Sequence, residues 1–483
     1  MKKKFYITTT LPYVNAEPHL GFALEIVQAD VIARHKTLEG FDVFFNFGTD
    51  EHGQKIYQAA QRAGKEPQKY CDEYATKFNS LKEALNLSYT NFIRTTDEHH
   101  IKAAQEFWKL CDENGDIYKK NYPVKYCVGC ELEKTDSELI NGRCPLHPDK
   151  DLEVREEENY FFKWSNYQQK LLDLYESQPD FVVPEKRFNE IKNFVRSGLQ
   201  DFSISRLKEK MPWGVPVPGD PDHVMYVWFD ALVNYISAID WPNDLDKFES
   251  FWPAIQVAGK DNLRQQSAMW QTMLMSAGLK PSKQIWIHGF ITNEGQKMSK
   301  SLGNVVNPLD LIKQYGTDAV RYYLLKYIHP FEDSNFTIES FKEVYNADLA
   351  NGLGNLVSRT AQMIEQYLKG KVQISWEGIE SHKKTAQFQE IKRLIEEYKF
   401  NFALQMVDVY INNSNQTIEA TKPWKLWEEG KIDKVSFILS EVAGRILIIA
   451  EHLKPFVPFT AEKIIKQFTA RKIKKEELLF PRI

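Results

Sequence analysis

The spacing of apolar and polar positions predicts alternating strands and helices at the start of the chain. Residues 5–10 form an apolar, β-branched run that is typical of a buried strand, and a proline-punctuated turn follows it. Apolar residues then recur at helical spacing over residues 20–38, and Gly40 is a plausible helix stop. Residues 41–47 form a second strand-like run. This order predicts a βαβ unit of a parallel sheet.

The α/β rhythm is then interrupted and later resumes. Residues 116–220 carry clustered cysteines, an acidic run and a proline-rich stretch, which indicate a domain inserted into the sheet. Strand-like runs return at residues 252–259 and 284–289, and the pattern beyond residue 340 is helical. We therefore expect an α/β protein with a Rossmann-type parallel sheet, an inserted domain and an all-α C-terminal bundle. The expected segments are sheet, insert, sheet, connection and bundle: 1–115, 116–220, 221–290, 291–340 and 341–483.

Composition and charge fit a globular protein with several domains. The chain has 483 residues, of which 43% are hydrophobic and 27% are charged. Its net charge is −4, but residues 341–483 hold 22 lysines and arginines against 18 acidic residues. This basic end favours contact with a polyanion, although a merely solvated surface would give the same count. No run of 18 apolar residues occurs and no signal-peptide cleavage site follows the N-terminal lysines, so we expect a cytoplasmic protein without membrane contact.

Cysteine spacing predicts a metal site in the insert. Cys127 and Cys130 form one knuckle and, after thirteen intervening residues, Cys144 and His147 form another. Three thiolates and an imidazole in two short knuckles match a closed tetrahedral Zn²⁺ site. The alternative is three buried thiols and a surface histidine. Because no coordination position stays open, we expect one structural Zn²⁺ that helps the small loops to fold.

Two further motifs have the residues expected of a nucleotide-binding site. His19 stands where the first strand turns into the helix, beside backbone N–H groups that bind anions, and Gly21 leaves room for close approach. Far downstream, Lys297 and Lys300 flank Ser299 in the segment KMSKS, where two ammonium groups could neutralise a transferring phosphate. Taken singly, the motifs also fit a helix-capping surface histidine and a solvated basic loop.

Together, PHLG at residues 18–21 and KMSKS resemble the signatures of class I aminoacyl-tRNA synthetases. GTDEHG at residues 48–53 and WFDALVNY at residues 228–235 narrow the resemblance to the methionyl enzymes, and it extends to about residue 472. The resemblance implies ATP-dependent ligation of L-methionine to methionine tRNA, elongator and initiator, through methionyl-adenylate. AMP and pyrophosphate are the implied by-products, and Mg²⁺ accompanies ATP.

The resemblance also implies three sets of site residues. The implied ATP site joins the first motif to KMSKS, with the histidine and both lysines catalytic: Pro18, His19, Gly21, Lys297, Ser299 and Lys300. The implied methionine pocket surrounds one carboxylate, which meets the α-amino group, with apolar and aromatic side chains that suit a polarizable thioether: Leu11, Tyr13, Asp50, Trp228, Ala231 and Tyr235. The implied anticodon-reading residues lie in the bundle: Asn355, Arg359 and Trp424.

Two positions depart from the family pattern. Phe22 stands where a second histidine is usual in the first motif, which suggests that Lys297 and Lys300 carry more of the phosphate stabilisation. Gln266 stands where a pocket histidine is usual. This chain therefore lacks a histidine at two positions where the family usually has one.

Two other functions compete with a methionyl enzyme. The first is a class I synthetase for leucine, isoleucine, valine or cysteine, but the insert is short for an editing domain and the pocket segment contains no cysteine. The second is a non-catalytic tRNA-binding protein on the same scaffold, which the intact KMSKS lysines argue against. The chain stops soon after the bundle without an oligonucleotide-binding extension, so we expect a monomer.

Overall fold

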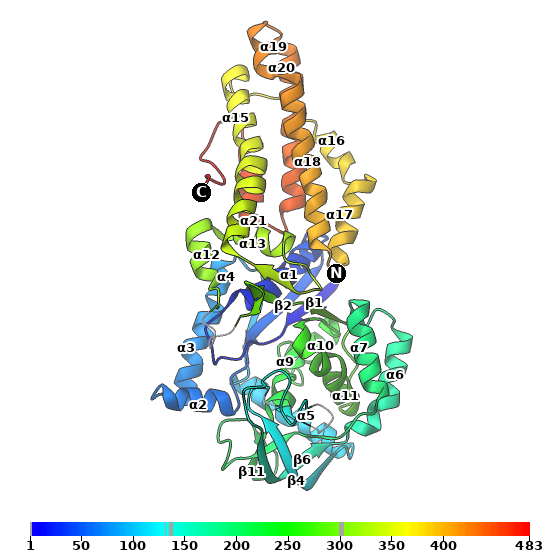
Figure 1. Cartoon of the computed structure of the whole chain (residues 1–483). Coiled ribbons are helices and arrows are strands. Elements are labelled where there is room, and N and C mark those ends of the chain that lie inside the picture. The colour runs from blue at the N-terminus through cyan, green and yellow to red at the C-terminus, as the bar shows by residue number, and fades with distance from the viewer. Residues whose placement is uncertain (1, 131, 135–138, 299–303) are drawn as a thin grey trace.

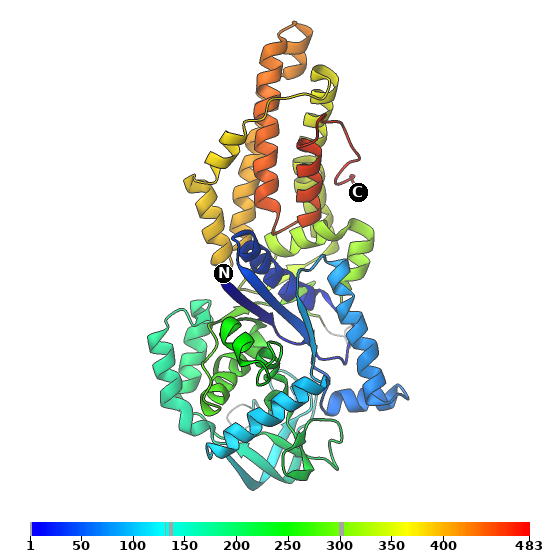
Figure 2. The same ribbon diagram turned by 180° about the vertical axis from the view of Figure 1, so that it is seen from behind.

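Three tiers make up the molecule: a helical bundle, a central parallel sheet and an antiparallel insert (Figures 1 and 2). The structure is a computed structural model that describes residues 2–130, 132–134, 139–298 and 304–483. None of the described helices combines the length and the apolarity that a bilayer crossing requires.

The central sheet has six parallel strands, and its order confirms the predicted βαβ unit. The chain crosses from the first strand to its neighbour through α1 (Leu20–Leu38). One edge strand, β7, comes from the stretch predicted as insert, so those residues also complete the sheet. In spatial order the strands are β3 (Asn91–Arg94), β2 (Asp42–Thr49), β1 (Lys4–Thr9), β12 (Ile255–Gly259), β13 (Gln284–His288) and β7 (Val182–Val183).

Both faces of this sheet are covered, as its uninterrupted apolar strands predict. Successive side chains point to opposite faces, so neighbours in one strand enter different cores. Ile7 and Trp286 join the core on the α1 side. Tyr6 and Ile285 join the core that includes α5 (Glu98–Glu113).

The insert is built on a long antiparallel hairpin. β4 (Ile117–Cys127) pairs with β6 (Glu153–Phe162) along their length. The first cysteine of the cluster ends β4, and the other three cluster residues lie between the two strands in the sequence. Two short strands complete this sheet: β5 (Leu132–Glu133) and β8 (Phe202–Ser203). A second small sheet leads back to the core: β9 (Ser205–Leu207), β10 (Pro216–Val217) and β11 (Asp220–Met225).

A small three-stranded sheet connects the second half of the core to the bundle. Its central strand, β14 (Ile291–Asn293), pairs antiparallel with β15 (Gln296–Lys297) and parallel with β16 (Ser334–Phe336). Helices α12 (Pro308–Tyr315) and α13 (Thr317–Lys326) lie between the last two strands in the sequence.

The C-terminal third is helical, as predicted. It opens with α14 (Ile338–Val344), which continues into a π-helical stretch, η6 (Tyr345–Gly354), that the apolar spacing does not reveal. The longest helices run side by side up the bundle in Figure 1. The remaining helices are α15 (Asn355–Leu368), α16 (Trp376–His382), α17 (Ala386–Glu396), α18 (Phe400–Thr421), α19 (Pro423–Glu428), α20 (Ile432–Leu453) and α21 (Pro458–Phe468).

One buried arginine joins the bundle to the sheet domain. Arg321, in α13, has no exposed surface and forms an ion pair of 2.8 Å with Asp30 of α1. Its guanidinium also donates to the carbonyls of Leu85, Pro455 and Phe456, between 2.8 and 3.1 Å away. These contacts satisfy a charge that would be costly to bury alone, and they hold three parts of the chain together.

Candidate active site

His19 begins α1 at the carboxyl end of β1. Its Nδ1 accepts a hydrogen bond of 3.1 Å from the backbone N–H of Gly21, so the imidazole caps the helix. A Cβ at residue 21 would lie 2.9 Å from the His19 ring, which explains the glycine. Phe22 packs its ring 4.2 Å from the imidazole, centroid to centroid. Pro18, just before the cap, is buried.

The segment that follows KMSKS lies against this cap. The backbone N–H of Leu20 donates to the carbonyl of Val306 over 3.0 Å. Asn293 of β14 donates through its side chain to the carbonyl of Asn304 over 2.9 Å. The backbone of Lys297 ends β15, while its side chain, Ser299 and Lys300 lie outside the described residues.

A buried ion pair braces the same edge of the sheet. Glu25 of α1 accepts from the backbone N–H of Thr10 over 2.7 Å and faces His288 Nε2 over 2.8 Å. The other nitrogen of His288 donates to the carbonyl of Gly289 over 2.7 Å. Both ring nitrogens therefore face acceptors. Burial opposes the charged form, but Glu25 raises the pKa of His288 and favours an imidazolium.

Asp50 follows β2 and is held through its backbone. Its N–H donates to the carbonyl of Pro12 over 3.0 Å, and its own carbonyl accepts from Val14 over 3.2 Å. Only 6% of Asp50 is exposed. The turn after β1 and the end of β2 therefore meet, as expected for polar residues at the carboxyl ends of parallel strands.

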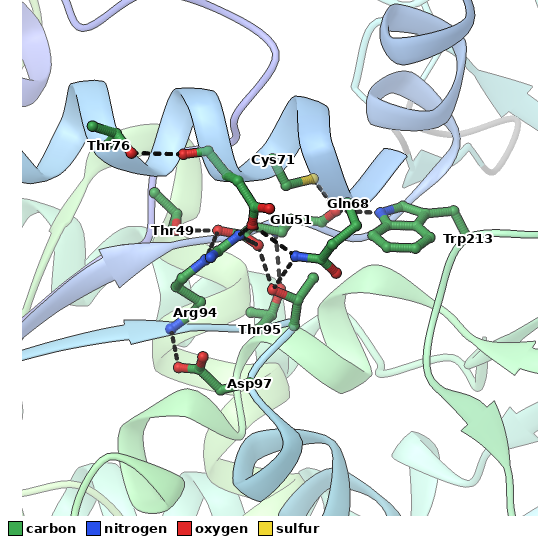
Figure 3. A network of polar contacts seen from close by, with 11 residues as sticks. Thr49, Glu51, Gln68, Cys71, Thr76, Arg94, Thr95, Asp97 and Trp213 are labelled. Carbon is green, nitrogen blue, oxygen red and sulfur yellow. Dashed lines mark hydrogen bonds and ion pairs between the residues drawn. The ribbon is translucent and has the colours of Figure 1, made fainter. Parts of the chain in front are cut away.

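Glu51, the residue after Asp50, is held by a network of hydrogen bonds and an ion pair (Figure 3). Its side chain has no exposed surface and forms a bidentate ion pair with Arg94, at 2.7 and 2.8 Å. Thr49 and Thr96 donate their hydroxyls to the same carboxylate, and the indole of Trp213 donates to the Glu51 carbonyl. A fully bonded side chain thus fixes the backbone next to Asp50.

His52 is anchored on the other side by Asp230. His52 donates from Nδ1 to one carboxylate oxygen of Asp230 over 2.7 Å, and His100 donates from Nε2 to the other over 2.9 Å. Ser237 lies 2.9 Å from the remaining nitrogen of His100. Burial opposes ionisation of Asp230, but the two histidines lower its pKa to about 2.

Aromatic side chains lie close to Asp50, whose backbone pairs with that of Tyr13. Tyr13 and Trp228 are half-buried and pack against the apolar group that contains Ala231. The hydroxyl of Tyr13 donates to the carbonyl of His52 over 2.6 Å, which ties the first loop to the second. Trp228 also packs against the core that contains Tyr235, which is 1% exposed. Leu11, in the same first loop, is half-buried.

The four predicted metal ligands converge in the insert. Their ligand atoms, three Sγ and Nδ1, all lie within 4.8 Å of one another. Cys130 Sγ lies 3.2 Å from Cys144 Sγ and 3.3 Å from His147 Nδ1. A Cβ on Gly129 would lie 2.2 Å from the His147 ring, so this turn requires glycine. With Cys127 as the fourth ligand, the donors suit a closed zinc site.

Two of the three predicted anticodon residues touch at the tip of the bundle. The Arg359 guanidinium lies 5.0 Å from the ring centroid of Trp424, within range of a cation–π contact, and pairs with the exposed carboxylate of Glu419. Asn355 is exposed one turn earlier in α15.

Comparison with known proteins decides the family. The family model described as "tRNA synthetases class I (M)" matches residues 5–152 and 133–361, and the model "Anticodon-binding domain of tRNA ligase" matches residues 382–481. The methionine–tRNA ligase of Thermotoga maritima is 43% identical, over 98% of this chain and 77% of its own. The chain belongs to the methionine–tRNA ligase family of class I tRNA synthetases.

Further relatives agree. The methionine–tRNA ligase of a Nostoc species is 43% identical, over 96% of this chain and 90% of its own. The solved structure of Mycobacterium tuberculosis methionyl-tRNA synthetase in complex with methionyl-adenylate aligns with a TM-score of 0.90 at 36% identity, and covers 99% of both chains. The fold expected from the sequence is therefore confirmed.

The structure brings most of the predicted site residues together at one edge of the sheet. The first motif, the residues after KMSKS, and the Tyr13–Asp50 turn all lie at the carboxyl edge of the sheet. Trp228 and Ala231 adjoin Tyr13. The roles of these residues remain predictions.

Sequence patterns did not indicate four other polar residues near this edge of the sheet. Glu25 and His288 are 263 positions apart, and neither belongs to a recognised motif. Arg94 and His100 likewise carry no local signal, because each is defined by a distant carboxylate. Glu25, one of two acidic residues inside the apolar helix at residues 20–38, was the one available clue, since a buried glutamate requires a partner.

Proposed function

We propose that this chain ligates L-methionine to methionine tRNA, using ATP and forming methionyl-adenylate, with release of AMP and pyrophosphate. The observation that carries the proposal is the hydrogen bond from Leu20 to Val306. It joins the first motif to the segment that follows KMSKS, at the same edge of the sheet as Asp50 and its aromatic neighbours. A triphosphate and an amino acid can then meet in one crevice.

In the first step, the methionine carboxylate attacks the α-phosphate of ATP and pyrophosphate leaves. The work is positioning and charge neutralisation, so no protein nucleophile is needed. His19, Lys297 and Lys300 are the proposed groups that neutralise the phosphates, with Pro18, Gly21 and Ser299 shaping the ATP site. Mg²⁺ accompanying ATP would neutralise further phosphate charge.

Asp50 is the proposed partner of the methionine α-ammonium group. The side chains of Glu51 and His52 hold the backbone on that side of Asp50, so the chain that carries the carboxylate is fixed before substrate arrives. The proposed pocket for the side chain is aromatic and apolar: Leu11, Tyr13, Trp228, Ala231 and Tyr235.

In the second step, the 3′-terminal adenosine of the tRNA takes the methionyl group. The bundle is proposed to bind the anticodon of elongator and initiator methionine tRNA. Asn355, Arg359 and the half-buried Trp424 would contact unpaired bases, because an indole face stacks on bases while amide and guanidinium groups bond base edges. We further propose that Zn²⁺ at the cysteine cluster is structural and that the protein acts as a cytoplasmic monomer.

Pyrophosphate exchange tests the proposal. With each of the twenty amino acids supplied in turn, methionine alone should support ATP–pyrophosphate exchange. Exchange with another amino acid would favour a different class I synthetase, and no exchange at all would favour a non-catalytic tRNA-binding protein. Lys300→Ala should lower the rate by about 100-fold, the loss typical for one charge-stabilising group. Lys313→Ala, on the exposed side of α12, is the matched control.

A further inference from the structure

A second aromatic contact lies beside the proposed anticodon residues. The rings of Tyr367 and Trp427 stack with their centroids 5.0 Å apart and their planes 24° apart. Tyr367 lies near the end of α15 and Trp427 lies in α19, so the pair joins the same two helices as Arg359 and Trp424. Both contacts therefore lie along one seam, which reaches the tip of the bundle at α19 (Figure 1).

The two tryptophans lie on the same side of α19. Trp424 and Trp427 are three residues apart, and residues at this spacing are neighbours on the surface of a helix. Their partners follow in the same order along α15, where Arg359 precedes Tyr367. One helical turn rises about 5.4 Å, so the two indoles are close enough to meet two bases of one RNA loop.

Trp427 keeps a large open surface although it is stacked. Tyr367 covers one face of the indole, yet 41% of Trp427 is exposed. A planar ring has two faces, so another ring can stack on the side that Tyr367 does not cover. A base placed there would extend a stack that is already formed, and stacking on an aromatic side chain is how proteins hold unpaired bases.

Exposed lysines lie close to this stack in the sequence. Lys369 follows Tyr367 by two residues, and Lys425 precedes Trp427 by two. Lys422 is exposed at the start of α19. None of these three ammonium groups forms an ion pair with another residue that the structure describes. Cations that track a phosphate backbone, beside an aromatic ring on which a base can stack, are the combination that binds single-stranded RNA.

We propose that Trp427, supported from behind by Tyr367, is a second stacking platform, which holds an unpaired base of the tRNA other than the base on Trp424. This inference deepens the proposed function and rests on it. Every base has a π face, so the platform accepts any base. Trp427 therefore contributes affinity for the RNA loop, whereas Asn355 and Arg359 are suited to reading base edges.

Trp427→Leu separates stacking on a base from packing within the bundle. Leucine keeps an apolar contact with Tyr367 but offers no ring, so KM for methionine tRNA should rise about 5- to 10-fold while kcat stays the same. Trp427→Phe keeps a ring and should retain most of the affinity. Trp376→Leu removes an exposed tryptophan of α16 and is the matched control, with no change in KM expected. Equal losses in the leucine and phenylalanine variants, or no loss in either, would overturn the inference.

Stem-loops that lack one base identify the base that Trp427 holds. Anticodon stem-loops of methionine tRNA, each with one abasic nucleotide, would be titrated against the wild type and Trp427→Leu. At one loop position the two losses should not add, because both changes remove the same contact, and any base at that position should restore binding. Additive losses at every position would refute the inference. Coupling at the position that couples to Trp424→Leu would also refute it, since the two indoles would then share one base.

A measurement on the unsubstituted chain covers the case in which Trp427→Leu fails to fold. In protein labelled with fluorotryptophan, the fluorine NMR resonance of Trp427 is the one that Trp427→Phe lacks. This resonance should shift when the stem-loop is added, while that of Trp376 stays in place. An unshifted Trp427 resonance in saturated protein would refute the inference. If the wild type neither binds the stem-loop nor charges methionine tRNA, the proposed function itself is wrong, which is a separate result.

Discussion

At the carboxyl end of β2, Glu51 has no exposed surface and forms hydrogen bonds through both carboxylate oxygens, whereas at the tip of the bundle the Glu419 side chain is 61% exposed. Both carboxylates pair with an arginine. In the crevice, however, the pair is closed by two hydroxyls, while the pair at the tip is open to solvent.

This difference fits what each end would bind. A small amino acid leaves little room for adjustment, so the groups around it are pinned before binding, at a cost in desolvation that hydrogen bonds offset. An RNA loop is flexible and large, so solvated side chains that can rearrange suit it better. Polar side chains that are held in place thus lie at one end of the molecule, and solvated polar side chains that can rearrange lie at the other.

The largest expected effect comes from removing Arg94. Arg94→Met leaves the Glu51 carboxylate buried without its partner, which typically costs about 3–5 kcal/mol in the free energy of unfolding. Urea or thermal unfolding of the sheet domain would measure the loss. Arg393→Met, which removes an exposed arginine paired with Glu390 and Glu397, is the matched control and should change stability by less than about 1 kcal/mol. Equal losses in both variants would contradict the distinction between a buried ion pair and an exposed one.

The second prediction concerns acid. Asp230 has a pKa of about 2 in the folded protein, below its value in the unfolded chain. A lowered pKa contributes stability above the unfolded value, and this contribution is lost as the pH falls through 2. Asp230→Asn should therefore destabilise the protein by about 2 kcal/mol at pH 6, and the difference from wild type should shrink between pH 4 and pH 2. Unfolding followed across this range would show it, and a constant difference would contradict it.

Local sequence patterns predicted the elements better than the contacts between them. The strand at residues 5–10, the helix at 20–38 and the zinc knuckles were readable because each depends on spacing within a short segment. The bracing of Asp50 was not, since Arg94 acquires its role only when β3 pairs with β2.

Two structural elements were missed for a similar reason. The strand β7 has two residues, too few to show a period, and pairing with β13 alone defines it. The π-helical stretch η6 shares the apolar spacing of a helix, so its hydrogen-bond register could not be read. By contrast, Arg359 and Trp424 were proposed by resemblance, and their contact adds geometry to that prediction.

The third prediction tests the bundle. Trp424→Ala should lower kcat/KM for tRNA aminoacylation by about 5- to 150-fold, because stacking of one base is worth about 1–3 kcal/mol. Methionine-dependent pyrophosphate exchange should not change, since the crevice is remote from the tip. Trp376→Ala removes an exposed tryptophan of α16 in the same bundle and should leave both reactions unaltered. A parallel loss of exchange in Trp424→Ala would instead indicate damage that spreads through the bundle.

The smallest expected effect comes from Glu419→Gln, which removes the exposed partner of Arg359. A solvated ion pair is worth about 0–1 kcal/mol, so unfolding should be almost unchanged, in contrast to the loss expected at Arg94. The variant also removes a negative charge from a surface proposed to meet RNA and releases the guanidinium. KM for tRNA should therefore fall by up to about threefold at low salt, and screening should abolish the gain at high salt. A higher KM would mean that Glu419 holds Arg359 in its binding position, which would make the tip of the bundle as preorganised as the crevice.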